Sequence, residues 1–175
     1  MRSARSGPAD NAGVMIRHDE LWRRIRVMVG VPMLEVLGGQ TNMELFVDGG
    51  CSGNSQRDIT RRRMRAAVVT TRGVIVAECI RDGGSNNIAE LLAVYEALAW
   101  CRACGIKAVT LYTDSRNNFA WVFGSRLGKR LADRAAVSDL QAEITALRAD
   151  VELRLQWVPR DDNRAGHYLE KTYGV

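Results

Sequence analysis

The sequence predicts an α/β fold with a five-stranded mixed sheet, three strands antiparallel and two parallel, flanked by helices. Three observations support this fold class. Two strand-like runs surround the turn Arg72-Gly73, which is the pattern of a hairpin. A long helical pattern then separates two further strand-like runs, and the full order is β-β-β-α-β-α-α-β-α. A strand, a helix and a strand in succession form a crossover, so the first and fourth strands are expected to be parallel.

The composition is that of an ordinary globular domain. The chain has 175 residues, of which 46% are hydrophobic and 26% charged. Its net charge of +5 favours a polyanionic partner, most often a nucleic acid. No apolar run approaches the roughly 20 residues that span a bilayer, and no apolar segment follows the N-terminal arginines. We therefore expect no membrane partner, no secretory signal and a cytoplasmic location.

The four cysteines are expected to be plain thiols. Cys101 and Cys104 form a C-x-x-C, and Cys51 and Cys79 stand apart. The C-x-x-C falls at the far end of a predicted helix, where the helix dipole has the wrong sign to activate a thiol. No further ligands lie at a spacing typical of zinc sites. Free thiols in a reducing cytoplasm are the favoured interpretation.

The chain divides into an N-terminal extension, residues 1–42, and a compact domain, residues 43–175. The extension carries a short amphipathic helix over residues 19–29, which either packs on the domain or contacts a partner. No obligate protein partner is evident.

Within the compact domain, a buried strand over residues 45–47 is expected to end at Asp48, where a Gly-rich turn leads to Asn54. An Arg-rich connector, residues 57–65, follows. The remaining predicted elements are the hairpin strands 66–71 and 74–80, a helix from 88 ended by Gly105, a strand 108–113, a helix 115–123, a basic connector 124–134, a helix 135–149, a strand 151–158, a loop 159–163 and a terminal helix.

Three carboxylates are predicted to converge. Asp48 and Asp114 each end a parallel strand at the same edge of the sheet, where open α/β sheets carry their sites. Glu90 lies in the first turn of the helix that connects them. Taken singly, Asp48 is also typical of a turn, and Asn87 with Glu90 resembles a capping box. Together, three hard oxygen ligands at this density predict a site for Mg²⁺ or Mn²⁺.

Four motifs resemble the ribonuclease H family, and within it the type I enzymes. In order they are FVDGGCSGN, NNIAEL, YTDS and WVPRDDNRAGHYLE, each on the expected element. The resemblance covers residues 43–170. It implies the ribonuclease H-like fold and a metal-dependent endoribonuclease that hydrolyses the RNA strand of RNA–DNA hybrids by a two-metal mechanism, with two Mg²⁺ or Mn²⁺ ions.

The resemblance also assigns residues. Asp48, Glu90 and Asp114 match the catalytic, metal-binding carboxylates. Asn54, Asn86 and Asn87 match positions that touch the RNA strand. The expected nucleic-acid interface further includes Arg116, Lys129, Arg130, Arg160 and Asn163.

The final motif departs from the family pattern. Where the family has N-x-x-x-D, Asn163 is followed by His167. We expect His167 to replace the Asp as the catalytic fourth metal ligand. The alternative is that a nearby carboxylate supplies that ligand and His167 is ordinary; the candidates are Asp161, Asp162 and Glu170.

Two other functions remain open. One is a related nuclease that acts on structured DNA or double-stranded RNA. The other is a nucleic-acid-binding module that has lost catalysis, for which the His167 change is the support and the three intact carboxylates are the counter-evidence.

Overall fold

The computed structural model describes residues 42–125, 127–128, 131 and 133–175. The expected N-terminal extension, its helix over residues 19–29, and the expected nucleic-acid contacts Lys129 and Arg130 lie outside these described residues. The domain boundary at residue 43 stays a prediction.

A five-stranded mixed sheet forms the centre of the domain, as predicted, and its strand order is β3-β2-β1-β4-β5. β1 pairs with β2 and β2 with β3 in antiparallel fashion, whereas β4 runs parallel to both β1 and β5. The strands are β1 Met43–Ser52, β2 Arg63–Thr70, β3 Ile75–Asp82, β4 Ala108–Thr113 and β5 Glu152–Trp157.

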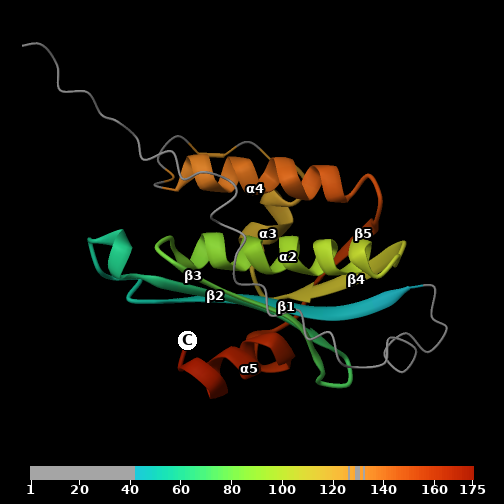
Figure 1. The fold of residues 1–175 in the computed structure, drawn as a ribbon, viewed down its shortest axis with the longest axis horizontal. Coiled ribbons are helices and arrows are strands. Elements are labelled where there is room, and N and C mark those ends of the chain that lie inside the picture. The colour runs from blue at the N-terminus through green and yellow to red at the C-terminus, as the bar shows by residue number, and fades with distance from the viewer. Residues whose placement is uncertain (1–41, 126, 129–130, 132) are drawn as a thin grey trace, which may run out of the picture.

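Helices cover both faces of the sheet, unequally (Figure 1). On one face lies α2 (Asn86–Ala103), with α3 (Arg116–Trp121) beside it and α4 (Arg134–Leu147) outside it. The other face carries α5 (Arg164–Tyr173). Two short 3₁₀ turns, η1 (Ile59–Arg61) and η2 (Arg160–Asp162), precede β2 and α5.

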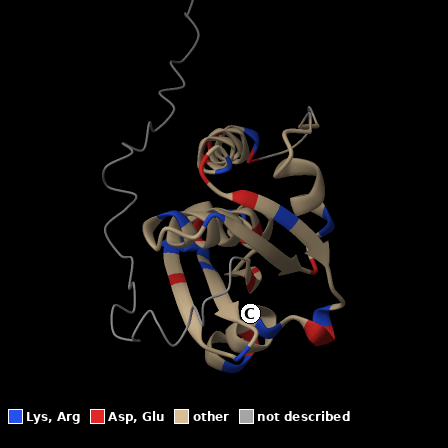
Figure 2. Cartoon of the chain, turned by 90° about the vertical axis from the view of Figure 1, so that its right-hand side faces the viewer, with Lys and Arg blue, Asp and Glu red and all other residues tan. Residues whose placement is uncertain are grey.

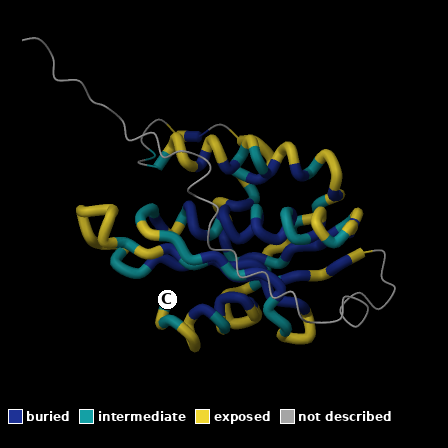
Figure 3. Tube along the Cα trace, viewed as in Figure 1, coloured by how far each residue is buried: buried dark blue, intermediate teal, exposed yellow. Residues whose placement is uncertain are grey.

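The burial pattern follows these layers (Figure 3). α2 lies between the sheet and α4, so apolar residues on several sides of it are buried, among them Leu91 and Leu98. α4 has one covered side, on which it buries Val137, Leu140, Ile144 and Leu147. Lys and Arg occur on many elements and are not collected on one (Figure 2).

A second, smaller core fixes α5 against β2 and β3. Leu169 packs there with Ala67 and Val69, all of them buried. The hydroxyl groups of Tyr168 and Tyr173 both donate to Oε1 of Glu78, at 3.0 and 2.6 Å. These two bonds join both turns of α5 to the edge strand β3.

The predicted end of the first strand is wrong. β1 continues past Asp48 to Ser52, paired with β2 from Asp48↔Ala67 to Ser52↔Arg63. The partner strand begins at Arg63, inside the segment interpreted as a connector, and its peptide groups extend the ladder over the glycines. Pairing with β4 stops earlier, at Phe46↔Tyr112. Asp48 therefore lies just past the point where β1 and β4 separate.

Two other local predictions have clear outcomes. Ser85, not Asn87, is the N-cap of α2, and no side-chain capping bond forms there. Instead, Asn87 Oδ1 accepts a hydrogen bond from Asn117. Cys101 and Cys104 are free thiols, as expected, as are the other two cysteines. Over the described part of the chain, no helix has the length and apolar character needed to cross a membrane.

Candidate active site

Three carboxylates from three different elements meet at the point where β1 and β4 separate. Asp48 belongs to β1, Glu90 to the first turns of α2, and Asp114 follows the last residue of β4. Asp48 is only 6% exposed. Burial, together with the negative charges of Asp114 and Glu90, raises the pKa of Asp48 to about 7. The convergence predicted from the strand order and the crossover helix is therefore present.

The carboxyl group of Glu90 is also perturbed. Burial and the charge of Asp114 raise its pKa, whereas a hydrogen bond with Ser115 and the charge of Arg160 act in the opposite direction. Its Oε2 atom is buried and has no hydrogen-bond partner. A buried carboxylate oxygen without a donor is costly unless a cation reaches it.

Gly49 sets the distance between β1 and α2. A Cβ atom at this position would lie 2.1 Å from the carbonyl carbon of Ala89 and 2.3 Å from the backbone nitrogen of Glu90. The strand and helix backbones therefore touch directly, which is possible only because residue 49 has no side chain. This contact places Glu90 next to Asp48. Sequence reasoning treated Gly49 only as part of a turn.

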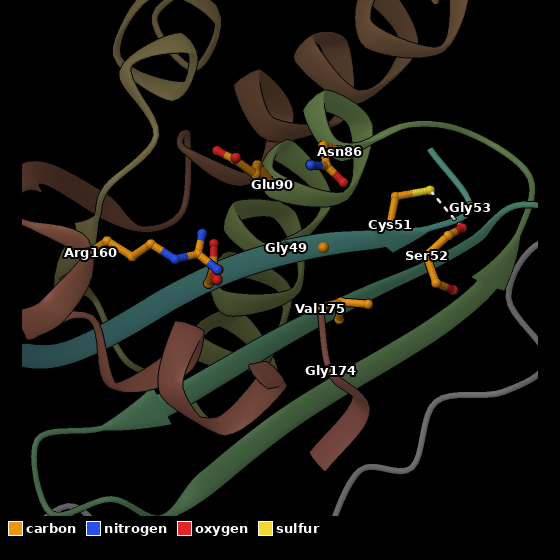
Figure 4. A pocket seen from close by; sticks show the side chains of 11 residues that line it. Gly49, Cys51, Ser52, Gly53, Asn86, Glu90, Arg160, Gly174 and Val175 are labelled. Carbon is orange, nitrogen blue, oxygen red and sulfur yellow. Dashed lines mark hydrogen bonds between the residues drawn. The ribbon is translucent and has the colours of Figure 1, made fainter. Parts of the chain in front are cut away.

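A pocket opens over the second half of β1 (Figure 4). Asp48 and residues 49–53 form one wall, and Asn86 and Glu90 come from α2. In Figure 4, Arg160 extends toward β1 from one end of the pocket, and Gly174 and Val175 lie beside β1. The contribution of Gly174 and Val175 had no signal in the sequence.

Arg160 brings a positive charge to the carboxylates. Its charge acts against the elevated pKa of both Asp48 and Glu90. The residue is exposed, so its guanidinium can face the pocket and solvent at the same time. Its expected role as a contact to nucleic acid stays a prediction.

Asn163 holds Asp114 in place from inside the protein. Its side chain is fully buried, and Nδ2 donates to Asp114 Oδ1 at 2.9 Å and to Val47 O at 3.1 Å. Its Oδ1 accepts from the backbone nitrogen of Ala165 and so caps α5. The whole amide is used within the protein. We therefore assign Asn163 to positioning Asp114 and not to a direct contact with nucleic acid.

Asn118 performs a related task from α3, and sequence reasoning did not find it. The side chain is 1% exposed, and Nδ2 donates to the backbone oxygen of Glu90 and to Thr113 Oγ1, each at 3.3 Å. The same Oγ1 accepts from the backbone nitrogen of Ser115 at 3.1 Å. These bonds join the start of α2 to the end of β4. The only sequence signal is a polar residue on the inner side of a short helix.

His167 is not brought into the group of carboxylates. It is exposed in the first turn of α5 and does not line the pocket. Its neighbour Gly166 faces the site, and a Cβ atom there would lie 3.0 Å from Asp48 Oδ2. The alternative ligands Asp161, Asp162 and Glu170 are exposed as well. The assignment of His167 as fourth ligand stays a prediction.

The asparagines expected to touch the RNA strand lie around the start of α2, and one of them, Asn86, lines the pocket. Asn54 Oδ1 accepts from the backbone nitrogen of Asn86 at 3.3 Å, which joins the end of β1 to the start of α2. Asn87 Oδ1 accepts from Asn117 Nδ2 at 3.1 Å. Asn54, Asn86 and Arg116 are exposed and remain accessible.

The donor set suits a hard divalent cation. It consists of carboxylate oxygens, one of them buried without a partner, and Mg²⁺ and Mn²⁺ prefer such ligands. Among the described residues, however, no three His, Cys, Asp or Glu side chains are arranged as a finished metal site. Asp114 Oδ1 is engaged by Asn163, and Arg160 already supplies positive charge. The chemistry of the donors fits a metal, although their arrangement is not a closed ligand set.

Comparison with known proteins adds independent evidence. The family model described as RNase H matches residues 40–166. The chain is 43% identical over 81 residues to the Gag-Pol polyprotein of avian reticuloendotheliosis virus, a stretch that is 46% of this chain and 6% of the polyprotein. The chain thus spans a small part of that relative.

Solved structures share the fold at low sequence identity. RNase H1 from Halobacterium salinarum has a TM-score of 0.54 at 20% identity, over 73% of this chain and 93% of its own. The N-terminal RNase H domain of Rv2228c from Mycobacterium tuberculosis has a TM-score of 0.56 at 22% identity, over 73% and 95%. An RNase H1 isolated from compost, in complex with an RNA/DNA hybrid, has a TM-score of 0.53 at 20% identity, over 71% and 91%.

Proposed function

The chain belongs to the RNase H family of ribonucleases, and from this premise we propose that it is an endonuclease that hydrolyses the RNA strand of RNA–DNA hybrids. The observation that carries the proposal is the meeting of Asp48, Glu90 and Asp114, close enough for Asp114 and Glu90 to raise the pKa of Asp48. Asn118 donates a hydrogen bond to the backbone oxygen of Glu90, and Asn163 donates one to the carboxylate of Asp114. These two bonds hold the arrangement in place.

The family uses divalent metal ions, and we propose two Mg²⁺ or Mn²⁺ ions here, held by Asp48, Glu90 and Asp114. When bound, such ions activate water and stabilise the leaving oxygen of a phosphodiester. The protein itself orients the ligands, keeps Asp48 largely out of solvent and presents Arg160 to phosphate oxygens. We retain His167 as a proposed fourth ligand, which would require its side chain to turn toward Asp48.

The hybrid is the proposed substrate because polar groups suited to a ribose lie at and beside the pocket: Asn86 lines it, and Asn54 accepts a hydrogen bond from the backbone nitrogen of Asn86. The amides of Asn54, Asn86 and Asn87 can exchange hydrogen bonds with a 2′-hydroxyl, the group that distinguishes RNA from DNA. A protein of the same fold was crystallised with an RNA/DNA hybrid. We also propose a cytoplasmic location, because all four cysteines are free thiols.

The decisive experiment is a cleavage assay with end-labelled RNA–DNA hybrid, RNA duplex, DNA duplex and a DNA junction, each with Mg²⁺, with Mn²⁺ and with chelator. We expect cleavage of the RNA strand of the hybrid, and only with metal. Asp48→Asn is the inactive variant. Asp139→Asn, an exposed carboxylate on α4, is the matched control.

Each other outcome has a clear meaning. If the protein cleaves the RNA duplex or the junction in preference to the hybrid, the proposed substrate is wrong and the protein acts as a related nuclease on double-stranded RNA or structured DNA. Metal-independent cleavage that survives Asp48→Asn would reject the site. Binding of hybrid without cleavage in either metal would favour a binding module.

A further inference from the structure

Arg65 lies next to the pocket in a defined position. It is on β2, directly opposite Gly50 of β1. Its guanidinium carbon lies 4.5 Å from the centre of the Tyr173 ring, and Nη1 donates to Ser52 Oγ at 3.1 Å. Ser52 lines the pocket, and Figure 4 shows it at the end away from Arg160. A ring and a hydroxyl thus orient this cation.

Arg65 has no anionic partner among the described residues. Arg63, two positions earlier on the same strand, pairs with Asp82, with Nε and Oδ1 3.5 Å apart. Glu78 lies on the neighbouring strand but accepts both tyrosine hydroxyls of α5 and forms no ion pair with Arg65. The Nε atom of Arg65 is buried without a hydrogen-bond partner. Burying a guanidinium whose N–H donors have no acceptor costs free energy, unless an anion accepts hydrogen bonds from them.

The neighbouring Arg62 differs from Arg65, because its guanidinium is bound to backbone oxygens within the protein. Its Nε and Nη2 donate to the backbone oxygen of Gln56, and its Nη1 donates to that of Gly84. All three nitrogens are used, whereas Arg65 uses Nη1 alone among the described residues. The charges of both arginines reach the pocket wall at Cys51. Burial raises the pKa of the Cys51 thiol, and the two positive charges act in the opposite direction.

We propose that Arg65 is a phosphate-binding subsite for the strand that is cut, at the end of the pocket opposite Arg160. Ser52 lies four residues beyond Asp48 on the same strand, which is about 13 Å at the usual rise per residue. A nucleic-acid backbone lying along this half of β1 would meet Arg160 beside the carboxylates and Arg65 farther along. Tyr173 and Ser52 hold the guanidinium before the ligand arrives, so little side-chain entropy is lost on binding. This inference rests on the proposed function.

The test compares Arg65→Gln with Arg63→Gln, which removes a charge from the same face of the same strand. Hybrid affinity is measured over a range of salt concentrations in the Asp48→Asn background, and kcat and KM in the active protein. Arg65→Gln should weaken binding about tenfold at low salt, as expected for loss of a charge-assisted contact. The slope of log K against log salt should become shallower by about 0.9. Arg63→Gln should change neither quantity by more than about twofold and should leave kcat and KM unchanged.

Arg65→Lys sharpens the result. It keeps the charge but loses the planar fork and its stacking on Tyr173, so the salt slope should be retained while affinity falls only in part. If Arg65→Gln and Arg63→Gln give the same affinity and slope, the subsite is rejected.

Protection of the wild-type chain gives a second measurement that needs no variant. An arginine-selective dicarbonyl reagent is applied with and without bound hybrid, and peptides are analysed by mass spectrometry. Hybrid should protect Arg65 and leave Arg63 reactive; equal protection of both residues, or protection of neither, overturns the proposal. Binding with Arg65 protected but without any cleavage would reject the proposed catalysis and leave the subsite intact. Normal cleavage with Arg65 unprotected would reject the subsite alone.

Discussion

The two halves of β1 differ in their neighbours and in what they contribute to the domain. In the first half, Met43, Leu45 and Val47 are buried, and the strand pairs with β4 on one side and, from Leu45, with β2 on the other. In the second half, from Asp48 to Ser52, β2 is the one pairing partner among the described strands. The half of β1 that has two neighbouring strands belongs to the core. The half that pairs with β2 alone, among the described strands, forms a wall of the pocket.

The separation of β1 from β4 produces this difference. β4 ends at Thr113, and Asp114 is then held by the Asn163 amide and by Trp157, whose Nε1 donates to the Asp114 carbonyl at 3.2 Å. Past this point, one edge of β1 is not covered by a strand, so ligands can reach side chains in the middle of a sheet. Changes in the first half should therefore cost stability, and changes in the second half should cost activity.

The largest expected effect is on cleavage by Asp48→Asn. The change removes a buried carboxylate, the proposed metal ligand, while the shape of the side chain and the surrounding arginines and asparagines remain. The cleavage rate should fall by at least about 10³-fold in Mg²⁺ or Mn²⁺, and hybrid affinity should change little. Single-turnover cleavage and equilibrium binding measure the two quantities. A residual rate within about tenfold of wild type would place the chemistry elsewhere.

Gly49→Ala should be the one change in the second half that destabilises the fold strongly. The added Cβ would lie 2.1 Å from the Ala89 backbone, so α2 must move. We expect a loss of about 3 kcal/mol or more in the free energy of unfolding, measured by urea denaturation. Gly128→Ala is the matched control, because nothing lies within 4 Å of a Cβ atom there. Equal stability of the two variants would contradict the backbone contact.

Leu45→Ala tests the first half of the strand. Leu45 has no exposed surface, so the change leaves a cavity and should cost about 2–5 kcal/mol of stability. Below the unfolding transition, kcat and KM should stay within about twofold of wild type. A large fall in kcat with the fold intact would mean that the two halves are not independent.

Stability without metal should depend on pH through Asp48. Its folded pKa, about 7, is above its unfolded value, so the folded state binds the proton more tightly. The free energy of unfolding should therefore decrease as pH rises from about 4 to about 7. Asp48→Asn should lack this contribution and be more stable than wild type at pH 8 by roughly 2–4 kcal/mol. Urea titrations of both proteins at pH 5 and pH 8 with chelator measure the free energy of unfolding. If Asp48→Asn is less stable than wild type at pH 8, the predicted direction of the pH dependence is wrong.

The smallest expected effect is that of His167→Ala. If His167 turns inward as a ligand, its loss should lower cleavage about tenfold, and His167→Asp should restore activity with a preference shifted toward Mg²⁺. Cleavage rates of the wild type and of both variants in each metal measure this. An Ala variant equal to wild type would transfer the role to Asp161, Asp162 or Glu170.

Much of the fold followed from local patterns. The hairpin around Arg72-Gly73, the crossover helix and the alternation of β5 are signals within short windows, and they indicate the order of strands and helices along the chain. The three carboxylates followed from that order, because two parallel strands end at the same edge. These features depend on periodicity and connectivity, which a sequence displays directly.

Features that depend on contacts between distant segments could not be predicted in this way. The extension of β1 to Ser52 depends on Arg63 and the residues after it, which resembled a charged connector. The burial of Asn163 depends on Val47 and Asp114, which are far from it in sequence. In each case the local residue type favoured one role, and a tertiary partner decided another.

The contact at Gly49 makes the spacing of two carboxylates insensitive to how the core is filled. When helices pack through side chains, a change of one methylene in the core shifts the helix and everything attached to it. Here the backbone of α2 lies on the backbone of β1 next to Glu90, with no side chain between them. Substitutions at core positions such as Leu91 or Leu98 can therefore accumulate over evolution, or be introduced by design, without altering the distance between Asp48 and Glu90.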